Sequence, residues 1–392
     1  MMKVNIEKGI YRLLLGVVFI VPISSFISVR LLFLSLLLSL VNCRWNNLLR
    51  VSWDLIIFLL VLIVGLFYTV SFDIGFKVLE TNFSFLAIPV IFSHFQNFDD
   101  KQLNKVFYFF VVGLFVTCSI CLGNAIFHYF QTGDAQFFFF YQLTDIISSH
   151  PTYLAYYLIF AITFGLYLLT DEKPPFHLIL VAFLIFFFFL VLLLTGGQTA
   201  FVSLLLVFSF FILKFFLGDR SGGQKLTVVV VVVMMVCMFF VSSTQSTKRE
   251  SELNDSWDRF ALWEAAIDAN PNILFGVGTG DASTVLNKYF RIHNLNEFAV
   301  DSLNSHNQFI QIYLSNGLIG LLALLLMLAR PLYLSFKNNN SFGILVFFPF
   351  LIYGMTEVFL GRYQGVVFFA LLHQVFVSYY ASSKPAFSLK ET

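Results

Sequence analysis

Residues 178–195 read LILVAFLIFFFFLVLLLT, a run of 18 positions without a charged side chain. A helix needs about 20 mostly apolar residues to cross the hydrocarbon core of a bilayer. The segment 176–195 is therefore predicted to span a membrane, and residues 198–217 form a second such segment directly after it. Two adjacent segments of this length and hydrophobicity are typical of a polytopic membrane protein.

The composition of the whole chain indicates the same class. Of its 392 residues, 59% are hydrophobic and only 11% are charged, whereas soluble proteins carry about 25% charged residues. A soluble enzyme, a nucleic-acid-binding protein and a secreted disulfide scaffold are thereby excluded, since too few polar side chains are present to cover a soluble surface. The net charge of +1 gives no overall field that would attract nucleic acid.

We predict an all-α membrane protein with about 12 transmembrane helices. The predicted spans are residues 12–29, 31–43, 54–71, 75–94, 105–129, 150–170, 176–195, 198–217, 226–243, 306–329, 341–360 and 363–382. The chain then divides into residues 1–243 with the first nine helices, 244–305 as a polar extracytoplasmic loop, and 306–392 with the last three helices and a short cytoplasmic tail.

The positions of the basic residues orient these spans. With the N-terminus in the cytoplasm, the inner segments carry 15 lysines and arginines, against Arg30, Lys77 and Arg362 in the short outer segments. Cytoplasmic loops of membrane proteins carry such an excess of basic residues. We therefore expect both termini in the cytoplasm and the loop 244–305 on the opposite side.

The loop contains two local patterns. Asp258 to Ala269 has apolar residues at helical spacing (Phe260, Trp263 and Ala266) and stops at Asn270-Pro271, which predicts an amphipathic helix able to lie on a membrane surface. The stretch Phe275-Gly-Val-Gly-Thr-Gly-Asp281 follows. Its glycines, Gly276, Gly278 and Gly280, would let backbone N–H groups approach an anion or a sugar. A flexible turn after the helix is the alternative.

Polar residues gather where the tenth predicted span begins. Five polar residues are consecutive there, namely Asn304, Ser305, His306, Asn307 and Gln308. Gln311 lies one helical turn after Asn307. An ionisable residue at the edge of a membrane span is a functional candidate. The alternative is a histidine that only forms hydrogen bonds at the interface.

The order of these motifs resembles the O-antigen ligase/polymerase superfamily. It consists of Arg259-x3-Trp263, then Pro271 and Phe275-Gly-Val-Gly-Thr-Gly280, then His306-Asn307-x-Phe-x-Gln-x4-Asn-Gly317-Leu-x-Gly320. The resemblance implies a glycosyltransferase, inverting and independent of metal and cofactor, that takes a glycan from undecaprenyl diphosphate at the periplasmic face of the bacterial inner membrane. The acceptor would be a hydroxyl of the lipid A-core in a ligase, or another lipid-linked repeat unit in a polymerase.

The resemblance also implies roles for particular residues. His306 matches the catalytic base, and Arg259 matches an arginine that holds the diphosphate through its bidentate fork. Gln198 stands where the family has an arginine, and its amide supplies no charge. Further candidates for contacts with the diphosphate or glycan are Arg291, Arg362, Glu357, Asn307, Gly276, Gly278 and Gly280, with His150 and Glu80 as supporting residues.

Four alternatives stay open at this stage. Glu357 and Arg362 are close enough in sequence to pair with each other, and His150 and Glu80 can equally be paired structural groups. We expect a ligase, with a polymerase of the same superfamily as the second reading. A transporter of polyisoprenyl-linked sugars is the alternative from a different class, although transporters usually show internal repeats and charges at the membrane midplane, and the sequence shows neither.

Overall fold

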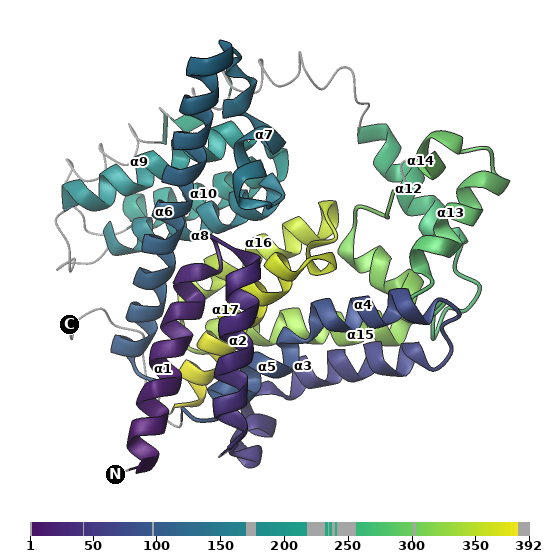
Figure 1. Cartoon of the computed structure of the whole chain (residues 1–392), viewed down its shortest axis with the longest axis horizontal. Coiled ribbons are helices and arrows are strands. Elements are labelled where there is room, and N and C mark those ends of the chain that lie inside the picture. Colours follow the sequence, from purple (N-terminus) through teal and green to yellow (C-terminus); the bar gives the residue numbers. More distant parts are fainter. Residues whose placement is uncertain are drawn as a thin grey trace. The chain divides into compact units, whose positions relative to one another are not determined.

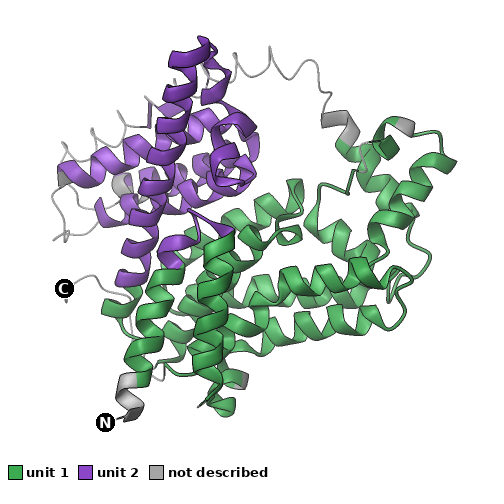
Figure 2. Cartoon of the chain, in the orientation of Figure 1, with its two compact units in different colours: residues 1–17, 26–103, 254–386 green, residues 18–25, 104–253, 387–392 purple. Residues whose placement is uncertain are grey.

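The computed structural model describes residues 2–41, 43–95, 98–169, 178–217, 232–233, 235–236, 240, 256–300 and 303–382. The chain forms two compact units, unit 1 with residues 1–17, 26–103 and 254–386, and unit 2 with residues 18–25, 104–253 and 387–392 (Figure 2). Most of the predicted span 226–243, the first part of the predicted loop and the end of the predicted tail lie outside the described residues.

The described residues are helical, with no strand among them. Unit 1 contains most of α1 (Met2–Ile20), and it also holds α2 (Ser25–Leu40), α3 (Trp45–Leu66), α4 (Phe72–Asn82), α5 (Ser84–Phe92), α12 (Ser256–Asp268), α13 (Ala282–Ile292), α14 (Asn296–Val300), α15 (Gln308–Lys337), α16 (Ser341–Thr356), the 3-10 turn η3 (Phe359–Gly361) and α17 (Tyr363–Ala381). Unit 2 contains most of α6 (Asp100–Thr132), followed by η1 (Ala135–Phe138), α7 (Phe140–Thr144), η2 (Asp145–Ile147), α8 (Pro151–Leu169), α9 (Leu178–Thr195) and α10 (Gln198–Leu217).

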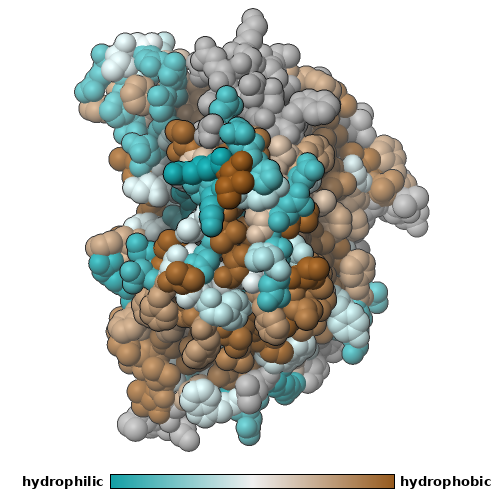
Figure 3. Space-filling model, turned by 90° about the vertical axis from the view of Figure 1, so that its right-hand side faces the viewer, coloured by the Kyte–Doolittle hydropathy of each residue, from teal (hydrophilic) through white to brown (hydrophobic). Residues whose placement is uncertain are grey.

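The helices confirm that the chain is a membrane protein. Within the described residues, 5 helical segments are long and apolar enough to cross a bilayer, namely residues 72–92, 100–132, 151–169, 308–337 and 363–381. Shorter apolar helices occupy residues 25–40, 179–195, 198–213 and 341–356. Figure 3 shows a face of the molecule with broad hydrophobic areas on its surface and hydrophilic residues gathered in its upper half. Such exposed apolar area is expected where lipid, and not water, surrounds the protein.

Several predicted span boundaries were wrong. The first predicted span, 12–29, is interrupted, because α1 ends at Ile20 and α2 begins at Ser25. Pro22 lies in the break, and proline both lacks an N–H donor and clashes with the preceding helical turn. The predicted span 54–71 is also too long at its end, since α3 stops at Leu66. The total of about twelve spans remains a prediction.

Unit 1 is organised around α15. This helix packs against α3 and α16, while α17 packs against α3 and α5. Figure 1 shows α3, α4 and α15 running side by side in the lower part of the view. The two segments of unit 1 that are far apart in the sequence therefore form one helical bundle.

A buried charged cluster joins three of these helices. Asp54 of α3 and His373 of α17 are fully buried, and the Asp54 carboxylate contacts both the guanidinium of Arg330 from α15 and His373 Nε2, the latter at 2.6 Å. Arg330 also donates to the backbone carbonyls of Val51 and Arg50, at 3.2 and 3.0 Å. Helix α3 is kinked at this point, and Arg330 satisfies carbonyls there. The sequence analysis did not predict this cluster, because Asp54 is far in the sequence from Arg330 and His373.

Candidate functional site

The start of α15 is fixed by its own polar residues. Asn307 is the N-cap, and its side-chain oxygen accepts hydrogen bonds from the N–H groups of Phe309 and Ile310 at 2.9 and 3.1 Å. Its side-chain nitrogen donates to the carbonyl of Met355 at 3.3 Å. The carboxamide oxygen of Gln308 accepts from the N–H of Leu360 at 2.8 Å. The cap thus satisfies exposed N–H groups of the helix and also ties α15 to the end of α16 and to η3.

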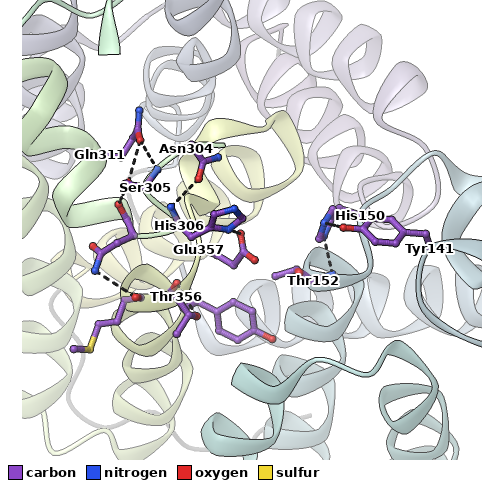
Figure 4. Close-up of polar contacts among 12 residues, drawn as sticks. Tyr141, His150, Thr152, Asn304, Ser305, His306, Gln311, Thr356 and Glu357 are labelled. Carbon is purple, nitrogen blue, oxygen red and sulfur yellow. Dashed lines mark hydrogen bonds and ion pairs between the residues drawn. The ribbon is translucent and has the colours of Figure 1, made fainter. Parts of the chain in front are cut away.

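His306 lies directly before this cap, in a left-handed backbone conformation with φ of 44°. Such a conformation is uncommon for a residue other than glycine and costs on the order of 1–3 kcal/mol. Its N–H donates to the side chain of Asn304 at 2.8 Å, and the Ser305 hydroxyl is 3.0 Å from the side-chain oxygen of Gln311 (Figure 4). Side chains of neighbouring residues therefore hold the strained backbone that presents the imidazole.

The imidazole faces a carboxylate. His306 Nδ1 lies 3.8 Å from Glu357 Oε2, and each side chain is about 30% exposed, at 31% and 29% (Figure 4). Glu357 is the first residue after α16, in an extended conformation. The alternative pairing with Arg362 is not formed, and Arg362 is exposed without an ion pair among the described residues. A carboxylate beside Nδ1 favours the tautomer with hydrogen on that nitrogen, which leaves Nε2 able to accept a proton.

Arg259 lies on α12, which confirms the helix predicted there. Of the predicted apolar positions, Phe260 is 66% exposed, whereas Ala266 is buried together with Leu262 and Ala265. These residues pack in one cluster with α13 and α15. The helix α13, which the sequence analysis did not anticipate, supplies the partner face. The sequence pattern that could have predicted α13 is the apolar series Ala282, Leu286 and Phe290, spaced four residues apart.

The glycine-rich segment lies against α15 and uses its own N–H groups there. The N–H groups of Val277 and Gly278 donate to the carbonyls of Leu314 and Ser315, each at 2.9 Å. The N–H groups of Thr279 and Gly280 donate to the Gly65 carbonyl and to the Thr69 hydroxyl, at 3.3 and 3.1 Å, and Gly276 donates to the Asn272 carbonyl at 2.7 Å. The interpretation of these N–H groups as a cradle for an anion was wrong, because protein oxygens already accept from them.

The segment fills a break in α15. Gly317 has φ of 62° and ψ of −158°, which interrupts the helix. The carbonyls on one side of the break accept from the glycine-rich segment, and on the other side Leu318 and Ile319 donate to the carbonyls of Ile273 and Leu274, at 2.8 and 3.3 Å. A broken helix within a membrane is tolerated where protein satisfies the freed backbone groups. Because glycine has no Cβ atom, Gly317 and the glycines of the facing segment allow the two backbones to lie this close together.

A substitution tests this packing role. Gly278 has φ of 110°, and a Cβ atom there would lie 2.4 Å from the Thr69 hydroxyl oxygen. We expect Gly278→Ala to destabilise the protein by about 3 kcal/mol, measured as a lower temperature of half-unfolding of the purified protein. Gly123→Ala is the control, because nothing lies within 4 Å of a Cβ at that helical glycine. Equal stability of the two variants would contradict the packing role.

Asp281, at the end of the same segment, binds the two residues that precede α4. Its two carboxylate oxygens accept from the N–H groups of Val70 and Ser71, at 2.6 and 2.7 Å. Burial of the carboxyl raises its pKa, but these N–H donors outweigh that effect and hold the pKa of Asp281 below its ordinary value. The stabilisation is therefore present above the ordinary aspartate pKa and is lost as the pH falls below it.

The remaining candidates lie on other elements of the fold. Gln198 is the first residue of α10, and His150 immediately precedes α8; both belong to unit 2, which is described by itself. His150 is paired, with Nε2 at 2.8 Å from the Tyr141 hydroxyl and Nδ1 accepting from the Thr152 N–H at 3.2 Å (Figure 4). Glu80 is exposed on α4. No group of three or more metal-ligating side chains occurs within the described ranges.

Comparison with known proteins supports the predicted resemblance. Residues 181–325 match the model of the O-antigen ligase family, and this range includes Gln198, Arg259, the glycine-rich segment and His306. The chain is thus a membrane protein with a segment similar to the O-antigen ligase family, which bears out the resemblance predicted from its motifs. An uncharacterized protein of Haemophilus influenzae is 24% identical over 140 residues, which cover 33% of this chain and 34% of that protein. This alignment spans about a third of the length of that relative.

Proposed function

We propose that the chain is a membrane glycosyltransferase of the O-antigen ligase type. In this proposal it moves a glycan from undecaprenyl diphosphate to a hydroxyl of an acceptor sugar, the lipid A-core or another glycan, at the periplasmic face of the bacterial inner membrane. The observation that carries the proposal is the His306–Glu357 pair at the start of α15, in which His306 belongs to the segment that matches the O-antigen ligase family.

The pair suits the removal of a proton from the acceptor hydroxyl. A neutral hydroxyl is a poor nucleophile, and a positioned base accelerates its attack. His306 Nε2 would take the proton while the acceptor oxygen forms a bond to the anomeric carbon of the glycan. The bond from that carbon to the diphosphate oxygen breaks in the same displacement, so the configuration at the anomeric carbon inverts. Glu357 would stabilise the positively charged imidazolium that results.

The leaving diphosphate needs a cation, because negative charge builds up on it as the glycosidic bond breaks. Arg259 is the proposed cation in unit 1. It forms no ion pair with another described residue, and its side chain is partly exposed. Gln198 supplies a hydrogen-bonding amide but no charge. Arg259 would therefore have to neutralise more of the negative charge on the diphosphate. Arg362, which is exposed and directly follows η3, is the second proposed cation. Asn307 and the three glycines are left out of the proposed site, because their hydrogen bonds are made within the protein.

Variants at position 259 test the proposed cation. We expect Arg259→Ala to lower the rate of transfer by 10-fold or more, on the order of 1.4 kcal/mol or above for a lost charge-assisted contact. Arg259→Lys is expected to restore only part of the rate, because an ammonium is a point charge without the bidentate fork. The measurement is transfer of a lipid-linked glycan in membranes that carry equal amounts of each variant. Full transfer by Arg259→Ala would remove this residue from the diphosphate site.

The surface polysaccharide of a deletion strain tests the function itself. A ligase predicts that glycan attached to the lipid A-core is lost while lipid-linked polymer accumulates. A single repeat unit on the core would instead identify a polymerase of the same superfamily. Loss of attached glycan with the lipid-linked glycan retained on the cytoplasmic face would instead favour a transporter and contradict both.

A further inference from the structure

A shallow hollow lies on the outward face of α13. It is lined by Ser283, Thr284, Asn287, Lys288 and Arg291. These positions share one side of the helix, since residues three and four apart are neighbours on a helix surface. The opposite side, with Ala282, Leu286 and Phe290, is buried in the cluster with α12 and α15. The hollow is therefore presented by a helix that is fixed on its other side.

The charged end of Arg291 is held in place. Its Nε donates to the side-chain oxygen of Asn287 at 3.0 Å, and the side-chain nitrogen of Asn287 donates to the carbonyl of Ala299 in α14 at 2.9 Å. Both the oxygen and the nitrogen of the Asn287 carboxamide are therefore held by hydrogen bonds within the protein. This arrangement fixes the guanidinium and leaves its two terminal nitrogens for a ligand.

The hollow carries positive charge that the described protein does not neutralise. Lys288 and Arg291 are both exposed, and neither forms an ion pair with a carboxylate of the described residues. The neighbouring Asp268 instead accepts from the Tyr289 hydroxyl at 3.4 Å. Two cations and two hydroxyls make a set of groups that fits a sugar with an acidic substituent, because a guanidinium pairs with a carboxylate or phosphate while hydroxyls bond the ring substituents.

We infer that this hollow is a binding site for an anionic sugar of the glycan substrate, separate from the site that holds the diphosphate. The inference rests on the proposed function and makes its substrate class more specific, namely a glycan that bears carboxylate or phosphate groups. It assigns Arg291 to the glycan and leaves Arg259 for the diphosphate. Asn287 acts as a positioning residue for Arg291.

Direct binding tests the site without requiring transfer. The full chain, purified in nanodiscs of neutral lipid, is titrated with fluorescent oligogalacturonate, with a phosphorylated oligosaccharide and with neutral maltohexaose. We expect both anionic probes to bind more tightly than the neutral probe, and the tighter of the two identifies the acidic group. The double variant Lys288→Ala/Arg291→Ala is expected to weaken anionic binding by about 3- to 10-fold at low salt, with a smaller loss at high salt.

Further variants separate this inference from the proposed function. Asn287→Leu keeps both cations but no longer positions Arg291, so it is expected to weaken binding by less than the double variant does. Lys337→Ala removes an exposed cation at the far end of α15 and is expected to change nothing. His306→Ala is expected to abolish transfer and leave oligosaccharide binding intact. The inference is overturned if the double variant binds the anionic probes as wild type does, or if maltohexaose binds equally well, and neither result bears on the role of His306.

Discussion

Replacing Arg330 by methionine is expected to lower the free energy of unfolding by about 3–5 kcal/mol. Asp54 is fully buried, and the Arg330 side chain is only 13% exposed. Without the guanidinium, the buried carboxylate keeps its charge and loses its cation, and the carbonyls of Arg50 and Val51 lose their donor. The measurement is the fraction of purified protein that remains monodisperse after heating.

Two further variants complete this test. Arg330→Met combined with Asp54→Asn removes both charges and is expected to recover much of the lost stability, since an uncompensated buried charge is the main cost. Arg50→Met is the matched control, because this exposed arginine donates to the carbonyl of Ala381 at 2.7 Å and has no carboxylate partner among the described residues. Stability of Arg330→Met equal to that of Arg50→Met would show that the buried cluster does not hold the bundle.

Replacing His306 by alanine is expected to lower glycan transfer by about 10²–10⁴-fold, the usual cost of removing a general base. The fold is expected to persist, because the cap of α15 is made by Asn307 and not by the imidazole. The variant is introduced into a deletion strain, and the glycan attached to the acceptor is compared with the glycan that stays lipid-linked, at equal protein levels.

A substitution of Glu357, the carboxylate partner of His306, is expected to lower transfer by an intermediate amount. Glu357→Gln keeps the shape of the side chain but no longer stabilises a charged imidazolium, so a smaller loss than that of His306→Ala is expected. Glu297→Gln, at an exposed carboxylate of α14, is the control and should transfer as wild type does. Transfer by His306→Ala within a few-fold of wild type would leave this histidine with a structural role at the interface.

Much of the fold class was available from the sequence, because span hydrophobicity is a local property. The segments 176–195 and 198–217 correspond closely to α9 and α10. The motif around His306 and Gly317 was also readable, and the match over residues 181–325 confirms the superfamily that it indicates.

Features that depend on contacts between residues far apart in the sequence could not be predicted from the sequence. The glycines near 278 suggested an anion cradle, and only the structure shows that carbonyls of residues 314 and 315 accept from that segment. Asp54, Arg330 and His373 lie on three helices, and their spacing in the sequence carries no signal. The pairing of Glu357 with His306 was missed for the same reason, since the nearer Arg362 was the local candidate.

The most direct test of the proposed function is a reconstituted reaction. Wild-type protein and His306→Ala are incorporated separately into liposomes with a polyprenyl-diphosphate-linked glycan and a soluble or lipid-anchored acceptor glycan. The account predicts that wild type consumes the donor, releases polyprenyl diphosphate and extends the acceptor, whereas His306→Ala leaves donor and acceptor unchanged over the same time. Equal product from the two proteins, or an intact donor with folded wild-type protein, would contradict it.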